Sequence, residues 1–365
     1  MHTLTQRALA PDLARGVMLL LIALAHAHMY LLPQTTGFRS YALDGSTLDM
    51  VVTGVQITLV DGRAMPMFAA LFGYGFVQIA ARQGDDARRV LRRRSVWLLV
   101  FGCAHALLLF FGDILAAYGL LGLLFAGAVR WKDRSLLVFA GLWLVVHGAA
   151  TALAGLQIAE FGGAAGLASA TDPVTAMIDR LMSWGVLTPF LLVDLIVPFL
   201  LGVLAARRKM LIEPHEHQKA LRAIAFGGIG TAVMGGFPLA LVDTGVWNGA
   251  PEVALYVLHG LSGVAGGLGY AALMGVLAVR LTQGPVVRAL AACGERSLTC
   301  YLLQSAVFVA VFVPYAGGLG SRLGTAAASG IAVLTWLATV ATAEVLRRND
   351  LNGPAETLLR KLTYR

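Results

Sequence analysis

The sequence has few charged residues. Asp, Glu, Lys and Arg make up 13% of its 365 residues, about half of the roughly 25% that soluble domains carry. Hydrophobic residues account for 58%, and the mean hydropathy is +0.75. These figures exclude an ordinary cytosolic globular protein and a disordered chain. They indicate a polytopic membrane protein.

Cysteines and the common catalytic and metal-binding motifs are also scarce. The three cysteines, Cys103, Cys293 and Cys300, are too few for a disulfide framework and lie in or beside apolar stretches, so we expect reduced core residues. The sequence has no Walker loop, no G-x-S-x-G element and no Cys/His pair at metal spacing. His215 and His217 in a basic loop are a weak metal signal. We therefore expect no metal.

Ten apolar stretches are long enough to cross a bilayer, which takes about 20 helical residues. Because helices satisfy their own backbone groups in lipid, the sequence predicts an all-α integral membrane bundle, a single transmembrane domain over residues 1–365. The ten stretches are residues 17–32, 64–81, 96–111, 114–129, 135–153, 184–206, 220–242, 253–279, 297–313 and 323–345. Residues 48–60 and 286–292 are predicted to be interfacial half-helices, 157–183 an external cap loop, and 346–365 a cytoplasmic tail.

The distribution of positive charge predicts the orientation. The net charge is +8, and all but four of the 28 Lys and Arg residues fall on the side of the N-terminus. The four exceptions are Arg39, Arg63, Arg180 and Arg322. Because Lys and Arg collect in cytoplasmic loops, we expect both termini to be cytoplasmic and the protein to lie in a bacterial inner (plasma) membrane. The excess charge gives no reason to expect a nucleic-acid partner.

Histidine is the main ionisable residue within the apolar stretches. Such residues are costly in a membrane and usually face the bundle interior. At about 1.5 Å per residue, His26, His28, His105 and His259 share one layer between the middle and the outer face of the membrane, with Asp113 at a neighbouring turn. Histidine suits proton transfer near neutral pH. A single membrane histidine, however, is roughly twice as often an interhelical hydrogen-bond partner as a catalytic base.

Some of these polar residues are open to a structural interpretation. His147 is isolated in the sequence, and we interpret it as such a partner. Asp194 lies between two prolines, which free backbone groups of the helix from their hydrogen bonds. A structural role, in which the Asp194 side chain satisfies these groups, and a functional role have the same weight. His26 and His28 are about 200° apart around a helix, so at most one of them points into a given site.

Five stretches match, in order, the motifs of a known membrane protein family. The matching residues are Asp12, Arg15 and Gly16; Phe68, Phe72, Gly73 and Gly75; His105, Gly112, Asp113, Ile114, Tyr118 and Gly122; Gly294, Thr299, Tyr301, Gln304 and Ser305; and Gly353, Pro354, Glu356, Arg360 and Thr363. On these motifs the chain resembles the YeiB-like membrane proteins, a family named for a domain of unknown function. It departs from that family where His26 and Cys300 replace the usual asparagines.

The resemblance implies an activity by analogy. YeiB-like proteins are grouped with the acyltransferase-3 and heparan glucosaminide acetyltransferase families in a transmembrane acyltransferase superfamily. The spacing of Arg15 and His26 is similar to the Arg-x10-His signature of the acyltransferase-3 family. The resemblance implies a ten- or eleven-helix enzyme that moves an acyl group, in particular acetyl, from cytoplasmic acyl-CoA to an outer hydroxyl or amine acceptor. The acceptor would be a small molecule, a glycan or a lipid, and the enzyme a homodimer among membrane lipids.

The roles of individual residues follow from this scheme. Arg15 and His26 are about three helical turns apart and lie on nearly the same face, so Arg15 would hold a phosphate of acyl-CoA and His26 would act as general base. His105 and Asp113 would orient the base. For Arg15, a structural ion pair with Asp12 has the same weight as binding of the acyl-CoA phosphate. The remaining assignments are Glu295, Arg296 and Gln304 to the donor entry, and His28, Tyr118 and His259 to the substrate.

Two other functions stay open. Membrane His and Asp residues suit the proton relay of a proton-coupled small-molecule transporter or exporter. The sequence shows neither an internal repeat nor paired broken helices, which such transporters often have. Alternatively, the protein is a non-catalytic scaffold whose histidines only pack, in which case joint replacement of His26, His105 and Asp113 would leave its function intact.

Overall fold

The computed structural model describes residues 9–161, 169–281 and 284–364. Within these ranges the chain is helical, and its only β-type contact is an isolated bridge between Thr36 and Ala42. The all-α prediction is confirmed. The helices are α1 (Leu9–Ala27), α2 (Thr47–Leu59), α3 (Ala64–Gln83), α4 (Ala87–Leu108), α5 (Leu115–Phe125), α6 (Asp133–Phe161), α7 (Pro173–Arg207), α8 (Gln218–Asp243), α9 (Glu252–Arg280), α10 (Pro285–Glu295), α11 (Ser297–Phe312), α12 (Thr325–Arg348) and α13 (Pro354–Tyr364). Short 3₁₀ turns follow α1, α3, α5 and α11.

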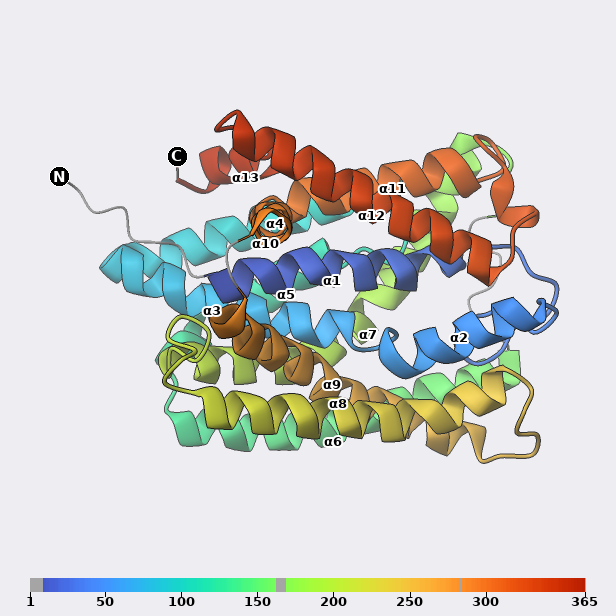
Figure 1. Ribbon diagram of the computed structural model, residues 1–365, viewed down its shortest axis with the longest axis horizontal. Coiled ribbons are helices and arrows are strands. Elements are labelled where there is room, and N and C mark those ends of the chain that lie inside the picture. Colours follow the sequence, from blue (N-terminus) through green and yellow to red (C-terminus); the bar gives the residue numbers. More distant parts are fainter. Residues whose placement is uncertain (1–8, 162–168, 282–283, 365) are drawn as a thin grey trace.

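The long helices run side by side in one bundle (Figure 1). Among the described residues, seven helical stretches are long and apolar enough to cross a membrane, and two shorter apolar ones, α5 with its following turn and α11, accompany them. Helix α1 packs against α3, α9, α10, α11 and α12. Its buried positions include Leu13, Met18, Leu19 and Ile22. The bundle therefore holds its first helix in the interior.

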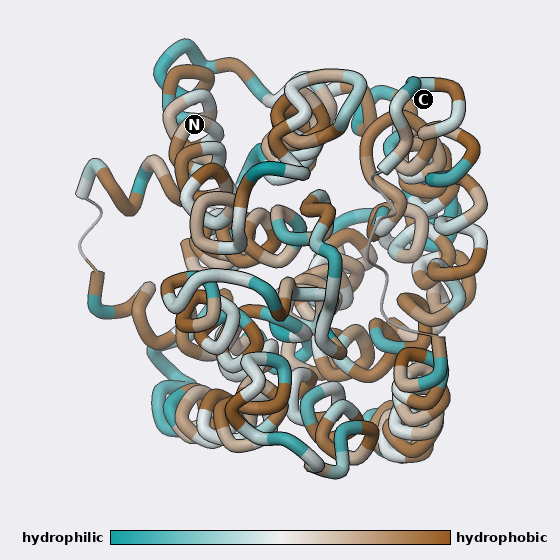
Figure 2. The backbone as a smooth tube through the Cα atoms, turned by 90° about the vertical axis from the view of Figure 1, so that its right-hand side faces the viewer, coloured by the Kyte–Doolittle hydropathy of each residue, from teal (hydrophilic) through white to brown (hydrophobic). Residues whose placement is uncertain are grey.

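The exterior of the bundle is apolar, as expected for a surface in contact with lipid. Helix α6 buries few residues, and its outer face presents Leu142 and Val145, which are 65% and 72% exposed. Phe226 and Met234 do the same on α8, at 81% and 77% exposed. Figure 2 looks along the helices and shows hydrophobic segments on all sides of the bundle. Exposed apolar faces of this size indicate a membrane protein.

Positive charge gathers at one end of the bundle. We call this the basic end: α1 begins there, and α13 lies there (left in Figure 1). Its side chains include Arg88, Arg89, Arg92, Arg93, Arg94, Arg130, Arg207, Arg208, Lys209, Arg347 and Arg348. The other end, which we call the opposite end, carries the loop of residues 31–46.

Helices α2 and α3 run in the same direction and traverse the bundle as one interrupted helix (Figure 1). The interruption covers residues 60–63, where Gly62 has a positive φ of 69°. The predicted half-helix over residues 48–60 is present as α2, but α2 packs against α8 and α12 within the bundle. The second one, over residues 286–292, is α10 and packs against α1 and α12.

The predicted bounds of the cap loop are wrong. Most of the expected cap loop over residues 157–183 is helix, because α6 continues to Phe161 and α7 begins at Pro173. Asp172 caps α7, since its Oδ1 accepts the amides of Val174 and Thr175 at 3.0 and 2.9 Å, a favourable start for a helix. Residues 162–168 of that loop lie outside the described residues. The tail over residues 346–365 is also largely helical, as the end of α12 and as α13.

Glycines set the closest helix contacts near the centre. A Cβ on Gly102 of α4 would lie 2.2 Å from the amide nitrogen of Ala116 and 2.4 Å from Oδ2 of Asp113. Only a residue without a side chain allows the turn before α5 to approach this closely. Gly102 therefore brings the Asp113 carboxyl group against α4.

Candidate functional site

Three polar side chains from α4, α11 and the turn before α5 form a buried hydrogen-bonded chain. Nδ1 of His105 lies 2.8 Å from Oδ1 of Asp113, and Nε2 of His105 lies 2.9 Å from Oγ of Ser305. Asp113 Oδ2 accepts the amide of Ala116 at 2.7 Å. His105, Asp113 and Ser305 are each at most 2% exposed. The structure thus brings together two of the three predicted catalytic residues and adds Ser305, which the sequence placed in a family motif without giving it a role.

His26 lies beside this chain and makes ring contacts with it. Its ring centroid is 4.3 Å from that of Phe110 and 6.1 Å from that of Tyr301, and Tyr301 is 4.8 Å from His105. His26 is the last residue but one of α1, and His105 is near the end of α4, so both lie towards the opposite end. The His105 hydrogen bonds go to Asp113 and Ser305, so the expected orientation of His26 by His105 and Asp113 is not seen.

A narrow cavity of about 80 Å³ leads to this group from the basic end. Arg94 and Ser297 contribute to its wall towards the basic end, and Tyr301 contributes to it beside His105. The rest of the lining is mainly apolar and comes from α1, α3, α4, α5, α11 and α13: Leu19, Ile22, Phe68, Phe72, Leu98, Ile114, Leu115, Tyr118, Leu298 and Leu359. The hydroxyl of Tyr301 is buried and has no acceptor within the described residues, although the backbone of Ile114 lies near it. Tyr118, a predicted substrate residue, is part of the wall.

The predicted donor residues have other contacts. Arg15 pairs with Asp12, at 2.9 Å between Nη1 and Oδ1, which is the alternative weighed for it. Arg296 donates to the carbonyl oxygens of Leu351, at 3.1 and 2.7 Å, and of Ala292, at 3.1 Å. It thereby ties α10 to the segment before α13. Arg94 was missed because it is one of several arginines in a run, and only its position on the inner face of α4 distinguishes it.

Glu295 and Gln304 also lie away from the cavity lining. Glu295 Oε2 lies 3.3 Å from Nη1 of Arg296. Gln304 donates to Oγ1 of Thr339 at 3.5 Å, so it faces α12. Among the predicted donor-entry residues, none lines the cavity.

A second polar cluster surrounds the interruption between α2 and α3. Arg63 is completely buried, and its guanidinium donates to the carbonyl oxygens of Asp61 and Ala232. Nη1 of Arg63 lies 2.6 Å from Nε2 of His259. Nε2 of His259 also lies 3.1 Å from the carbonyl oxygen of Ile57. His259 is therefore part of this cluster and not of the group around His105.

The loop of residues 31–46 closes the second cluster from the opposite end. Tyr41 donates to Asp61 at 3.2 Å and stacks on His28, with ring centroids 3.9 Å apart. Arg39 Nε lies 3.6 Å from Asp61 Oδ2, and the amide of Arg39 donates to the Asp243 carboxyl group at 2.7 Å. His26 and His28 therefore point into different sites, as their angular separation predicts.

The electrostatics of that loop reflect burial beside a carboxylate. Burial and the neighbouring Asp61 both raise the pKa of Tyr41 well above its ordinary value, so its hydroxyl stays protonated. Burial lowers the pKa of Arg39, but the neighbouring acidic groups, with Asp61 the largest contributor, together outweigh burial and raise that pKa above its ordinary value. From the sequence, Arg63 was named only among the four exceptions to the distribution of positive charge, and Asp61 was given no role. The signal that identifies them is a charged Asp-Gly-Arg triplet between two apolar helical runs.

His147 is an interhelical partner, as interpreted from the sequence. Its Nδ1 lies 2.9 Å from Oδ1 of Asp194, so the two form a contact between α6 and α7. The contact of Asp194 is thus with a histidine side chain and not with the backbone groups freed by the prolines. Within the described ranges, no three His, Cys, Asp or Glu residues are grouped so as to hold a metal ion.

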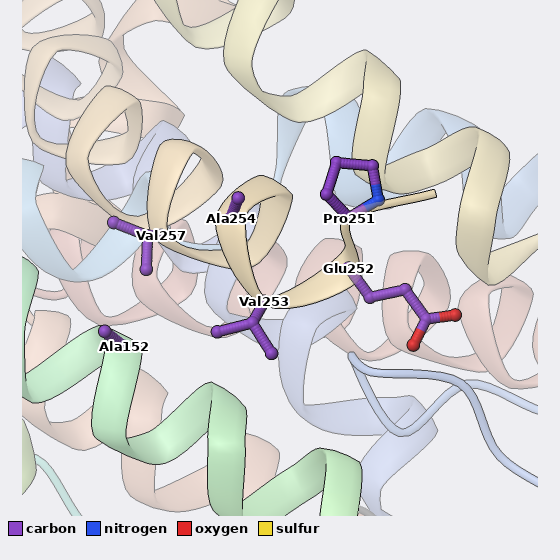
Figure 3. A pocket seen from close by; sticks show the side chains of 6 residues that line it. All are labelled: Ala152, Pro251, Glu252, Val253, Ala254 and Val257. Carbon is purple, nitrogen blue, oxygen red and sulfur yellow. The ribbon is translucent and has the colours of Figure 1, made fainter. Parts of the chain in front are cut away.

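A wide depression on the outside of the bundle has no comparable chemistry. Its lining is Ala152, Pro251, Glu252, Val253, Ala254 and Val257. Figure 3 shows the Glu252 carboxyl group pointing away from the other five side chains. The depression is therefore an apolar gap between α6 and α9.

Comparison with known proteins gives relatives along the whole chain. Residues 205–365 match the family model described as "Protein of unknown function (DUF418)". The chain is 26% identical to uncharacterized protein YxaH of Bacillus subtilis, over 97% of this chain and 93% of that protein. It is also 26% identical to uncharacterized protein YeiB of Escherichia coli, over 99% and 97%. No solved structure matches the chain significantly. The family resemblance predicted from the motifs is confirmed.

Proposed function

We propose that this chain, which is related along nearly its whole length to the YeiB-like membrane proteins, is a membrane-bound acyltransferase. It would move an acyl group, most simply acetyl, from acyl-CoA to a hydroxyl or amine acceptor, a small molecule, glycan or lipid. The observation that carries the proposal is the cavity with Arg94 in its wall at one end and Tyr301, beside His26 and His105, at the other.

The proposed orientation has the basic end in the cytoplasm of a bacterial cell, with the bundle in the inner membrane. Lys and Arg accumulate on the cytoplasmic side of such membranes. Acyl-CoA is then on the same side as Arg94, and the acceptor approaches from the opposite end, where α1 ends at His26 and His28. Transfer through the bundle would carry the acyl group across the membrane without carrying the rest of the donor.

The chemistry follows from the surroundings of the cavity. A guanidinium binds a phosphate through two parallel hydrogen bonds, so Arg94, with Arg15 nearby on α1, would hold the phosphates of the donor. The apolar walls would exclude water, which otherwise hydrolyses a thioester. His26 would then remove the proton of the acceptor. Tyr118 would contact the acyl group, and His28 the acceptor.

The test is release of CoA from acetyl-CoA by the purified protein in lipid nanodiscs. His26→Ala is expected to lower the rate by about 10²- to 10⁴-fold, the usual contribution of a general base. The matched control is His147→Ala, because His147 is a membrane histidine that contacts Asp194 away from the cavity. CoA is measured by chromatography, because thiol reagents also modify the exposed Cys103. Equal CoA release by the wild type, His26→Ala and a protein-free blank would exclude the proposal.

The second candidate, a proton-coupled transporter, is favoured by one observation. The interruption between α2 and α3 places Asp61, Arg63 and His259 in the interior of the bundle, at 1% exposure or less. Interrupted helices with buried ionisable groups bind substrates and coupling ions in many transporters. Flux into liposomes that depends on a proton gradient and is lost in Asp61→Asn, without CoA release, would support this candidate over the acyltransferase.

A further inference from the structure

Ser305 ends the hydrogen-bonded chain from Asp113, and a direct transfer between donor and acceptor gives it no role. We infer that Ser305 is the nucleophile of a two-step transfer and carries the acyl group as an ester between the donor and the acceptor. The inference rests on the proposed acyltransferase function and adds a covalent intermediate to it.

Asp113 fixes which nitrogen of His105 carries a proton. An ionised carboxylate only accepts hydrogen bonds, so Nδ1 of His105, 2.8 Å from Asp113 Oδ1, is the donor. Nε2 is then the acceptor, and it lies 2.9 Å from Oγ of Ser305. Ser305 donates its proton to His105. This is the arrangement in which a histidine oriented by a carboxylate activates a serine.

The partner of Ser305 distinguishes it from other buried serines in these helices. Ser95 donates to the carbonyl oxygen of Leu91, at 2.8 Å, and Ser329 donates to that of Thr325, at 2.6 Å. Such bonds to the carbonyl four residues earlier are the ordinary way to bury a helical serine. Ser305 instead has a ring nitrogen of His105 as its partner, and His105 in turn contacts the Asp113 carboxyl group.

The cavity ends one helical turn before the proposed nucleophile and base. Tyr301 in its wall is one turn before Ser305 on α11, and Ile22 is one turn before His26 on α1. A thioester at this end of the cavity would reach Ser305 from the basic end. The buried Tyr301 hydroxyl has no acceptor, and it would donate a hydrogen bond to the thioester carbonyl oxygen, which becomes negative during attack.

Both steps balance in atoms and protons. In the first, Oγ of Ser305 bonds to the acyl carbon, the C–S bond of the thioester breaks, and the Oγ proton moves to His105. CoA leaves as a thiolate and takes a proton from water at the basic end. In the second, the acceptor oxygen or nitrogen bonds to the acyl carbon and its proton moves to His26. The ester bond to Ser305 breaks, Oγ regains its proton from His105, and His26 releases one proton to water at the opposite end.

The test uses His26→Ala to trap the intermediate. If His26 serves only the second step, this variant should accumulate the ester when the full-length protein is incubated with radiolabelled acetyl-CoA. Proteolysis and mass spectrometry are expected to find one acetyl group on the peptide containing Ser305. The control is Ser95→Ala in the same background, since Ser95 is also a buried helical serine; it should leave labelling unchanged. Ser305→Ala in that background should abolish it.

A further variant guards against misfolding of Ser305→Ala. Ser305→Cys keeps a nucleophile at the position, and its acyl group would be a thioester that neutral hydroxylamine cleaves, whereas the serine ester resists. The inference would be overturned by three results together: the wild type releases CoA, the Ser305 peptide of His26→Ala stays unlabelled, and Ser305→Ala releases CoA at an undiminished rate. The acyltransferase proposal would then still stand. Absence of CoA release by the wild type would instead remove the acyltransferase proposal itself.

Discussion

Replacement of Gly102 by alanine should disturb the His105–Asp113 pair without changing either residue. The added Cβ would lie 2.2 Å from the amide nitrogen of Ala116 and 2.4 Å from Oδ2 of Asp113. One of these contacts is with backbone, so α4 and the turn before α5 must separate by several tenths of an ångström. Overpacking of this kind costs about 1–3 kcal/mol, and the movement draws Asp113 away from His105.

The matched control is Gly141→Ala on α6, where an added Cβ meets no atom within 4 Å. Alanine is the better helix former by about 0.5–1 kcal/mol, so the same substitution should stabilise the protein there. The assay is the apparent melting temperature of purified protein in one detergent at one scan rate, because such unfolding is often irreversible. Gly102→Ala should lower it by several degrees, and Gly141→Ala should leave it equal or raise it.

CoA release gives a second readout for the same pair of variants. Gly102→Ala should lower the rate even at temperatures where the variant remains folded, since loss of the Asp113 contact frees the tautomer and orientation of His105. Equal melting temperatures for the two variants would refute the close approach of α4 and α5. A lower melting temperature with an unchanged rate would show that the His105–Asp113 contact does not serve the reaction.

Two further predictions concern contacts outside the cavity. Arg63→Met should cost about 1–3 kcal/mol, because it leaves the buried carbonyl oxygens of Asp61 and Ala232 without the guanidinium donor, and it should lower the yield of monodisperse protein after extraction; a yield equal to that of the wild type would contradict this. His147→Ala should cost about 0.6 kcal/mol and at most about 1.7, the range for polar contacts between membrane helices. A double-mutant cycle with Asp194→Asn measures it, and no coupling between the two positions would show that the 2.9 Å contact contributes nothing.

Hydropathy was sufficient for the helices because a lipid environment leaves few alternatives. Each apolar stretch of about 20 residues must form a helix, so the ten stretches could be found from the hydropathy along the sequence. Boundaries were less certain, since helices continue beyond the apolar part. Helix α4 begins at Ala87, before the predicted start at residue 96, because its first turns are basic residues that are favourable at the end of the bundle.

Side-chain partners could not be derived from the sequence in the same way. Depth along the chain correctly grouped His105, near the end of α4, with Asp113 in the turn before α5. It also grouped His28 and His259 with them, although these two belong to the second cluster. Depth gives the height of a residue in the bundle and not its direction around the axis. That direction depends on which helices are neighbours, and a single sequence does not contain this information.

The end of α1 lies between the two polar sites, which has a consequence for how they act together. His26 contacts Tyr301 on one side, and His28, in the 3₁₀ turn that continues α1, stacks on Tyr41 on the other. Tyr41 also donates to Asp61 at the helix interruption. A shift of Asp61 would therefore pass through Tyr41 and His28 to the end of α1, which holds His26. Both sites would therefore bias the position of the same helix end. A ligand bound at one site should change the affinity of the other site for its ligand, and the effect should be reciprocal. The connecting element is α1 and not the lipid-facing helices.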